Sequence, residues 1–483
     1  MNKVFKLNLV LIPLFCALLN NCVPKLLQKQ PNESLVVPEK FPNFPTESDL
    51  EKSEAKNAIN VLDKSWKLFI QDESLTNLIE IALKNNQELN ILEQEINIAN
   101  NVVMARQGKY LPKVGLNAGY ENRKSSLLSK ESDIDTALNL ANQPNNYTLG
   151  MNASWEVDIW KKLRNSAKSS YYEYLSSIEG KNFAVTQLIA EIATSYYELM
   201  ALDNQLEIVK EYISTLEQAQ QVVEMQMFAG RTTSLAVKRF TAETLRNQSR
   251  KQQIQQQIII TENKLNSLVG RLPQPIQRKS EGFTEIAIQN INAGIPADLI
   301  ENRPDIRKAA LKMKVAKLNV KSVKAEFYPS LSIDANLGYQ SFNSKYLVSP
   351  QTGAYAFAGG LTAPILNRKA IKAEYFSANS EQIKALYVYE QTFIKGFSEV
   401  LNQLTSLENL KDIYSYKLQQ TQVLSESFEI SDILFKAARI DYLESLLTRR
   451  DYLESQIELI EIKKQQLSTY VNLYKALGGG WRE

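Results

Sequence analysis

The chain has 483 residues, of which 44% are hydrophobic and 23% are charged, and its formal net charge is only +3. This balance does not favour a nucleic-acid-binding surface. The sequence contains no histidine, which excludes a Ser-His-Asp triad, a Cys-His pair and histidine-ligated zinc. The absence of histidine does not exclude catalysis by lysine or by carboxylates. Composition therefore makes an enzyme less expected without excluding one.

The N-terminus has the pattern of an export signal. A short basic region precedes a mostly apolar stretch at 7–19, which is too short for a spanning helix. It ends in Leu19-Asn-Asn-Cys22, which is similar to a bacterial lipobox and predicts a lipoprotein signal peptide at 1–21 and lipidation of Cys22. The alternative is an ordinary signal peptide with an incidental cysteine, because Asn21 replaces the usual small residue.

Residues 22–60 contain five prolines separated by polar residues. This composition predicts an extended, lipid-anchored tether without a rigid connection to the folded body. After Cys22 no stretch approaches about 18 uninterrupted apolar residues, so no spanning helix is expected in the mature chain. Crossing a membrane would then require a closed β-barrel.

Long helical patterns dominate from about residue 66 to 476. Apolar residues at 185–216 recur every three or four positions, close to the spacing of a coiled-coil seam. A turn signal occurs at 228–234, which predicts two helices of about 40 residues each. A second pair is expected at 370–437 and 441–477. A structural rod or an oligomerisation coiled coil would show the same periodicity.

Four shorter segments alternate apolar residues with polar or small ones, which is the pattern of membrane strands. They are 114–120, 147–157, 331–339 and 354–362. Four strands form two hairpins and are too few to close a barrel, so several copies of the chain are expected to share one.

The two halves of the chain repeat this order. The first repeat is expected at 61–275 with a hairpin at about 113–158, and the second at 276–478 with a hairpin at about 329–365. From Asp158 to Gly230 is 72 residues, and from Pro364 to Ala438 is 74. Repeated strand and helix pairs are much less expected of a plain coiled coil.

Several motifs fall in the order and spacing of one family. These are Ser65–Phe69, Trp155–Trp160, Leu265–Gly270 and, most strongly, Leu299–Ile306 with its Arg-Pro-Asp-Ile stretch. Over about residues 60 to 478 the chain resembles the TolC-like outer membrane efflux proteins, especially the NodT-like lipoprotein branch that serves RND-type multidrug pumps.

The resemblance implies a mostly α fold with some β structure: a TolC-like trimer in which a long α-helical coiled-coil barrel continues a shared 12-stranded outer-membrane β-barrel, four strands per protomer. It implies a passive exit duct for small molecules such as drugs, with no enzymatic activity and no cofactor. The implied partners are two further copies of the chain, a periplasmic adaptor (membrane fusion protein), an inner-membrane pump and outer-membrane lipid.

The chain also departs from the family pattern. Lys161 and Ala438 stand where the family usually has glycine, and Ala310 where it usually has glutamate. Since alanine disfavours a left-handed turn, the geometry of the tip near Ala438 is the feature most affected.

By the same resemblance, Asp441 and Glu444 occupy the positions of the periplasmic gate, where a trimer would turn each carboxylate into a ring of three. The alternative is a solvated helix start, which favours carboxylates through the helix dipole. Arg231 and Arg439 flank the two helical tips and are candidates for pairing with these carboxylates or with an adaptor. They would equally suit plain surface positions.

Aromatic residues near the strand ends, Tyr120, Trp155, Trp160 and Tyr339, are candidates for an interfacial girdle, with core packing as the alternative. Three rival functions remain open: a periplasmic adaptor, a structural envelope coiled-coil lipoprotein and a type I protein-secretion duct. An adaptor carries a single helical hairpin, whereas two are expected here.

Overall fold

The computed structural model describes residues 23–25, 37–38, 40–42, 59–60, 66–70, 72–122, 145–288, 291–292, 295–364 and 368–481. The expected signal peptide and Cys22 lie outside the described residues. The chain divides into two compact units, each built from both halves of the sequence. Unit 1 comprises 1–34, 96–176 and 309–388; unit 2 comprises 35–95, 177–308 and 389–483.

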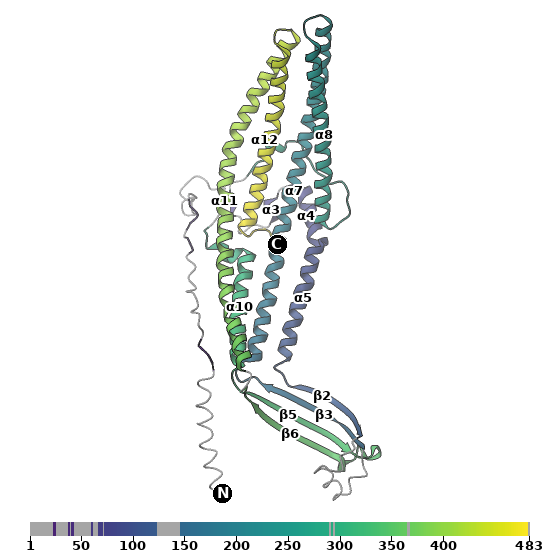
Figure 1. Cartoon of the computed structure of the whole chain (residues 1–483), viewed down its shortest axis with the longest axis vertical. Helices are drawn as coiled ribbons and strands as arrows, with labels where there is room; N and C mark the ends of the chain where they lie inside the picture. Colours follow the sequence, from purple (N-terminus) through teal and green to yellow (C-terminus); the bar gives the residue numbers. More distant parts are fainter. Residues whose placement is uncertain are drawn as a thin grey trace. The chain divides into compact units, whose positions relative to one another are not determined.

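Helices and strands follow one another twice in the same order (Figure 1). In the first half they are β1 (Ile59–Asn60), α3 (Trp66–Phe69), α4 (Glu73–Asn85), α5 (Gln87–Gly108), β2 (Lys113–Asn122), β3 (Asn145–Val157), α7 (Lys162–Phe228) and α8 (Ser234–Val269). In the second half they are η2 (Phe283–Glu285), β4 (Ile291–Asn292), α9 (Asp298–Asn302), α10 (Pro304–Ala325), β5 (Ser330–Ser341), η3 (Ser344–Tyr346), η4 (Pro350–Thr352), β6 (Gly353–Thr362), α11 (Arg368–Lys436) and α12 (Tyr442–Ala476).

The four predicted strands are confirmed and form one antiparallel sheet in the order β2-β3-β5-β6 (Figure 1). The register places apolar residues opposite one another on neighbouring strands: Leu116 lies opposite Met151, which lies opposite Leu337. Because side chains alternate between the two faces of a strand, this register gathers the apolar side chains on one face.

The two predicted pairs of long helices are also present. In the first pair, α7 has 67 residues and is longer than the expected length of about 40 residues. In the second pair, α11 has 69 residues and agrees with its expected range of 370–437. The partners α8 and α12 have 36 and 35 residues. None of the described helices is both long enough and apolar enough to span a lipid bilayer.

All four long helices end in the same backbone motif. At Gly230, Gly270, Ala438 and Gly478 the residue takes a positive φ, and the following amide donates to the carbonyl five residues earlier. This is a Schellman C-cap, in which glycine is favoured because it has no Cβ. Ala438, with φ 53°, therefore keeps the turn that the family pattern assigns to glycine.

Lys161, with φ 61°, is the only other non-glycine residue with a positive φ in the described part of the chain. It too stands where the family usually has glycine. Lys161 and Ala438 thus adopt a left-handed conformation without glycine, contrary to the expectation that alanine would disturb the tip, and each costs about 1–2 kcal/mol of conformational strain.

Close backbone contacts require glycine just after the ends of α8 and α12, at Gly270 and Gly478. A Cβ at Gly270 would lie 2.4 Å from the Asn85 carbonyl oxygen, and one at Gly478 would lie 2.6 Å from that of Asn302. Asn85 ends α4 and Asn302 ends α9, so each repeat rests a short helix on a glycine-capped long one.

Within the segment predicted to be an extended tether, the described residues 37–38 and 40–42 lie against the folded body. Phe41 is 1% exposed and stacks on Phe397 of α11, with ring centroids 5.3 Å apart. Val37 packs against the same core. Aromatic burial of this kind fixes the segment to unit 2 more firmly than proline content alone suggests.

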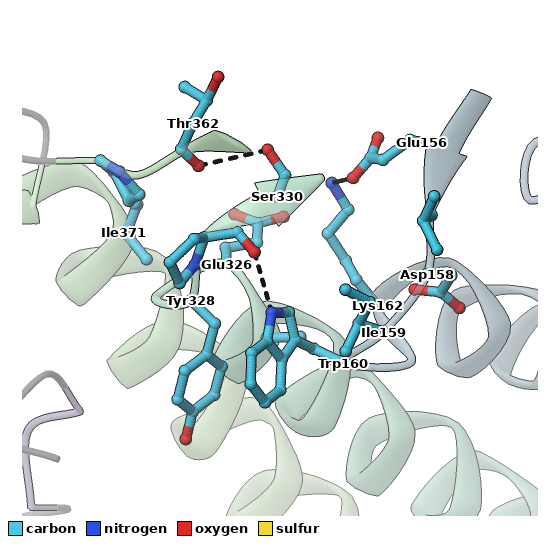
Figure 2. A pocket seen from close by; sticks show the side chains of 14 residues that line it. Glu156, Asp158, Ile159, Trp160, Lys162, Glu326, Tyr328, Ser330, Thr362 and Ile371 are labelled. Carbon is cyan, nitrogen blue, oxygen red and sulfur yellow. Dashed lines mark hydrogen bonds and ion pairs between the residues drawn. The ribbon is translucent and has the colours of Figure 1, made fainter. Parts of the chain in front are cut away.

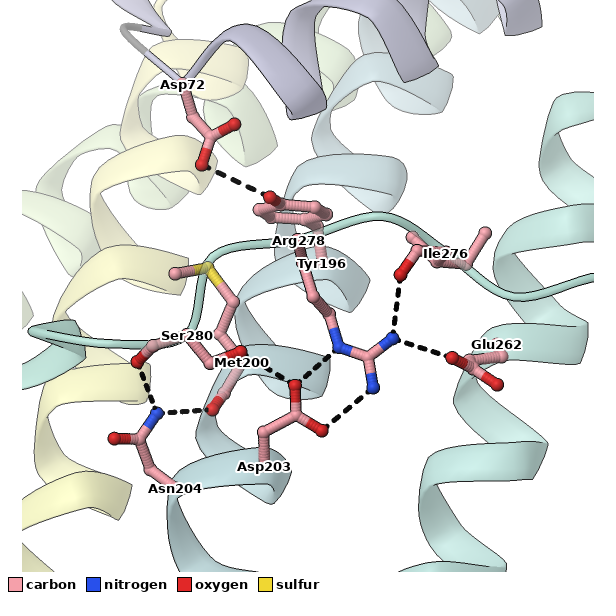
Figure 3. A network of polar contacts seen from close by, with 9 residues as sticks. All are labelled: Asp72, Tyr196, Met200, Asp203, Asn204, Glu262, Ile276, Arg278 and Ser280. Atoms are coloured by element: carbon pink, nitrogen blue, oxygen red, sulfur yellow. Dashed lines mark hydrogen bonds and ion pairs between the residues drawn. The ribbon is translucent and has the colours of Figure 1, made fainter.

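The connector after α8 is held to the helices by a polar network (Figure 3). The Arg278 guanidinium bonds both carboxylate oxygens of Asp203, at 2.5 and 2.8 Å, and Glu262 at 2.6 Å. Asn204 donates to the Ser280 carbonyl oxygen. A bidentate arginine in a half-buried setting is a strong, directional tie, so this network fixes the path of the connector across α7 and α8.

The strained backbone conformation of Ala438 leads to a testable prediction. Ala438→Gly should stabilise the α11–α12 tip by about 0.5–1 kcal/mol, because glycine relieves the positive φ at a smaller entropic cost. Amide hydrogen exchange at 434–442 should slow. Ala437→Gly, one residue earlier and without a positive φ, is the matched control and should speed exchange. Equal effects from both variants would contradict the strain.

Candidate functional site

The apolar face of the four-stranded sheet is exposed to solvent in a single chain. Leu116 on β2 is 84% exposed, and Tyr355 and Phe357 on β6 are 87% and 75% exposed. The opposite face carries polar and small residues such as Asn117, Thr148 and Asn336. Monomeric soluble proteins rarely expose an apolar surface that runs across four strands, so this face requires an apolar environment or a partner.

The strand lengths fit that requirement. The four strands have 10, 13, 12 and 10 residues. A tilted membrane strand needs about 9–11 residues. Within the described residues, β2 and β6 each pair along one edge only, which leaves two edges with unpaired backbone groups.

The four predicted girdle aromatics lie at the two ends of the sheet. Tyr120 and Tyr339 are exposed near the loop ends of β2 and β5, and the Tyr120 hydroxyl donates to Asn145 at 2.9 Å. Trp155 and Trp160 lie at the helical end, where their indole N–H groups donate to the backbone oxygens of Tyr110 and Pro329. Placement at both ends, with an exposed apolar face between, is the arrangement of interfacial aromatics.

The strands join the helices around a cavity of about 290 Å³ (Figure 2). The Trp160 ring stacks on Tyr328 at 4.7 Å, and Lys162 pairs with Glu156 at 2.5 Å. Asp158 is buried and accepts from the backbone amides of Leu163 and Arg164, at 3.0 and 2.9 Å, which caps the start of α7. The Trp155–Trp160 motif therefore builds the joint between sheet and helix.

One carboxyl in this joint has a perturbed pKa. Burial first, and then the negative charge of Glu374, raise the pKa of Glu326 above its ordinary value of 4.5, while Lys162 opposes the shift. The polar groups that line the cavity are largely paired with one another. The joint is therefore a structural connection between strands and helices rather than a reaction centre.

The predicted gate residues lie at the α11–α12 tip. Asp441 is the N-cap of α12, and its carboxylate accepts from the backbone amide of Tyr442 at 2.7 Å. Glu444 is exposed one turn later, and Leu447 follows it on the same face. Asp441 therefore acts as a helix cap within one chain, as the alternative to a gate role predicted. For Glu444 the described residues provide no ion-pair partner.

The two tip arginines remain on the surface. Arg231 and Arg439 are both exposed, and neither lies within ion-pair distance of a carboxylate in the described part of the chain. Their backbone amides, rather than their side chains, complete the Schellman caps. Around them the tips expose large apolar side chains, including Phe228 at 85% and Ile433 at 69%. Such side chains at a helix tip favour a protein partner.

The tips contain a buried arginine that the sequence analysis did not single out. Arg449 is 2% exposed, forms an ion pair with Asp432 and stacks its guanidinium 5.2 Å from the Phe428 ring. Burial alone would raise the pKa of Asp432, but the hydrogen bond from Lys436 and the charge of Arg449 outweigh it and lower that pKa. The pair therefore ties α11 to α12, and its contribution is lost only as the pH falls below about 4.

The Arg-Pro-Asp motif also has a structural role. Arg303 is 4% exposed, bonds Asp305 at 3.1 and 2.7 Å, and donates to the Ala476 carbonyl oxygen at 2.8 Å. Pro304 is the first residue of α10, where its missing N–H is no loss. The motif thus starts one helix and caps the end of another 173 residues away.

Sequence comparison agrees with this architecture. The family model described as "Outer membrane efflux protein" matches residues 78–271 and 295–479, so it covers most of both halves. The chain belongs to this family. The family is one of transport channels.

Individual relatives match over most of the chain. The solvent efflux pump outer membrane protein SrpC of Pseudomonas putida is 26% identical over 421 residues, which are 86% of this chain and 87% of SrpC. The pyoverdine export outer membrane protein OpmQ of Pseudomonas aeruginosa is 27% identical over 424 residues, which are 86% of this chain and 87% of OpmQ.

Solved structures show the same fold. The open-state MtrE outer membrane channel of Neisseria gonorrhoeae superposes with a TM-score of 0.79 at 22% identity, over 95% of this chain and 98% of MtrE. The predicted fold class is therefore confirmed as that of TolC-like channels: mostly helical, with a four-stranded antiparallel sheet.

The buried Arg303 makes a second prediction. Arg303→Lys should lower the free energy of unfolding by about 2 kcal/mol, because lysine cannot bond Asp305 bidentately and reach the Ala476 carbonyl at the same time. Arg307→Lys is the matched control: Arg307 is more exposed and pairs with Glu179, so it should cost under about 1 kcal/mol. The denaturant midpoint of the helical circular dichroism signal measures both. Similar losses would show that Arg303 is no more than an ordinary ion pair.

Proposed function

We propose that this chain is the outer-membrane component of a tripartite efflux system, a passive duct for small molecules supplied by an inner-membrane pump. The observation that carries the proposal is the exposed apolar face of the β2-β3-β5-β6 sheet, together with its polar opposite face. A sheet with one face for lipid and one for water suits the wall of a membrane pore.

The open edges of the sheet support assembly from several copies. Among the residues that the structure describes, β2 and β6 leave backbone groups unpaired along their outer edges, which is costly in lipid. Pairing β2 of one copy with β6 of the next satisfies both edges, and three copies close a twelve-stranded sheet. The helices of unit 2 then continue the pore as three repeated pairs of hairpins, from repeats at 61–275 and 276–478.

The exposed helix tips support a protein partner. Phe228 and Ile433 offer apolar contacts to a periplasmic adaptor, with Arg231 and Arg439 beside them. Names of relatives that refer to solvents and to pyoverdine support small-molecule cargo of varied kinds. Transport by such a duct needs no catalysis of its own, so no enzymatic activity is proposed.

Asp441 and Glu444 are proposed as the gate at the periplasmic tip. Both are exposed in one chain, and a threefold axis would bring three copies of each into one constriction. Asp441 also caps α12, so replacement by alanine would disturb the helix start as well as the charge. Asparagine at this position keeps the cap and removes the charge.

Lipidation of Cys22 is proposed as the membrane anchor. Cys22 lies outside the described residues, but its neighbour Val23 packs against the cluster of Val320, Phe327, Ile371 and Tyr375. These residues belong to the helical part of unit 1 that adjoins the strands. A lipid attached next to Val23 would therefore be close to the membrane in which the sheet is proposed to lie.

The pore is tested by reconstituting the purified full-length protein in planar bilayers and measuring its size in detergent. A trimer that conducts is expected. Asp441→Asn with Glu444→Gln should lower single-channel cation conductance at least about twofold, because the constriction loses the ring of negative charge that concentrates cations in it. The matched control, Asp451→Asn with Glu458→Gln further along α12, should change conductance less.

A monomer without conductance would overturn the duct and favour a structural envelope coiled coil. Conductance that is unchanged in both pairs of variants would leave the duct and remove Asp441 and Glu444 from the gate. Co-purification with a protein-exporting pump would favour the type I secretion duct.

The anchor is tested by mass spectrometry of the mature protein. The expected N-terminal peptide begins at Cys22 and carries a diacylglycerol group, and Cys22→Ser should abolish that mass. Cys16→Ser is the matched control: Cys16 lies in the proposed signal peptide and should leave the mature mass unchanged. A mature chain without lipid on wild-type Cys22 would overturn the anchor.

A further inference from the structure

Positive charge is concentrated in unit 1. The described residues of this unit carry 18 basic and 8 acidic side chains, a net charge of +10, whereas the whole chain has a net charge of +3. The part of α10 that belongs to unit 1 holds five lysines and no acidic residue. A charge asymmetry of this kind within one chain indicates a partner of opposite charge.

The basic side chains are ordered along two helices beside the sheet. On α7 and the residue before it they are Lys161, Arg164 and Lys168; on α10 they are Lys317, Lys321 and Lys324. Each set is spaced three or four residues apart, so each forms one stripe on its helix, and all six side chains are exposed. We call these six residues the basic collar.

The two stripes meet on one surface. The Nζ atom of Lys168 lies 6.0 Å from the centroid of the Tyr172 ring, and that of Lys314, one turn before Lys317, lies 5.5 Å from the same centroid. Since Tyr172 is on α7 and Lys314 on α10, the ring bridges the helices. The collar is therefore a continuous surface feature rather than two separate rows.

Most of the collar has no acidic partner in the part of the chain that the structure describes. Arg164 is 3.5 Å from Asp158, whose carboxylate is already occupied by two backbone amides. Among the described residues, the other five collar residues are in no ion pair. Uncompensated lysines on one surface repel one another unless an external anion is present.

The same order of residue types recurs where the chain passes between strand and helix. From β3 into α7, Trp160 precedes the basic residues; from α10 into β5, Tyr328 follows them. At the end of α5, Arg106 and Lys109 precede Tyr110 and β2. The start of α11 is basic as well, at 368–372. Apolar strand, then aromatic, then basic residue is the sequence of environments met on leaving a lipid bilayer.

We propose that the basic collar binds the headgroups of anionic phospholipids, in the leaflet on the helical side of the sheet. This inference rests on the proposed function, because it requires the sheet to lie in the membrane. Collar residues within about two turns of the strands, or about 10 Å, lie close enough to the surface for its charge to act on them. The collar would set how deeply the sheet sits and favour an anionic lipid annulus.

The test uses the full-length protein reconstituted in phosphatidylcholine vesicles that contain increasing fractions of phosphatidylglycerol. Quenching of tryptophan fluorescence by brominated lipid reports lipid contact, because Trp155 and Trp160 lie at the strand–helix joint. The expected result for the wild type is stronger quenching by brominated phosphatidylglycerol than by brominated phosphatidylcholine. This preference should weaken as salt is raised.

Lys317→Gln, Lys321→Gln and Lys324→Gln together should lower the preference for phosphatidylglycerol about fivefold or more, since one lysine near an anionic surface contributes up to about fivefold. The matched control is Lys238→Gln, Lys279→Gln and Lys411→Gln, which removes three exposed lysines from unit 2 and should leave the preference unchanged. Circular dichroism checks that both variants fold.

Equal quenching by the two lipids, or a triple variant that behaves like the wild type, would overturn the collar and indicate that these lysines line the duct. Loss of the preference on adding inorganic phosphate, but not chloride at equal ionic strength, would also overturn it in favour of a soluble-anion site. Conductance measured in the same lipids separates the two proposals: a conducting protein without lipid preference refutes only the collar.

Discussion

The structure depends on a sheet that one chain cannot complete. Four antiparallel strands place their apolar side chains on one face, and within the part of the chain that the structure describes both outer strands keep an unpaired edge. In water this arrangement would expose apolar surface and aggregate through its edges. In lipid it would leave backbone groups without partners. Both problems disappear when copies of the chain close the sheet together, so assembly and membrane location follow from the same constraint.

A second constraint on the structure is that the long helices must end at defined positions. Each long helix ends in a left-handed cap, and the caps at Gly230 and Gly270 recur at Ala438 and Gly478 with the same separation of 40 residues. Buried polar ties then fix where the shorter helices rest: Asn86 bonds the Leu268 carbonyl in the first repeat, and Arg303 bonds that of Ala476 in the second. The same position in each repeat is thus held by a different side chain. Duplication preserved the geometry of the joint rather than its chemistry.

The two units differ in the charge that they expose, and the fold by itself does not require this difference. Carboxylates gather at the α11–α12 tip, where Asp441 and Glu444 are exposed, whereas uncompensated lysines gather beside the sheet. The tip ion pair between Arg449 and Asp432 is internal and ties one hairpin together. Exposed charges in each unit are therefore available to other molecules: a protein or cargo at the helix tips, and lipid headgroups next to the strands.

The sequence by itself determined the strands and the helical hairpins. Both follow from local spacing, with a period of two for strands and of three to four for helices. The structure, and not the sequence, showed that Lys161 and Ala438 adopt a left-handed conformation without glycine. Only the tertiary structure decided that Phe41 inserts beside Phe397, that Arg449 is buried, and that α7 runs for 67 residues. These features depend on which distant segments meet, and periodicity records the face that a residue occupies but not the partner that covers it.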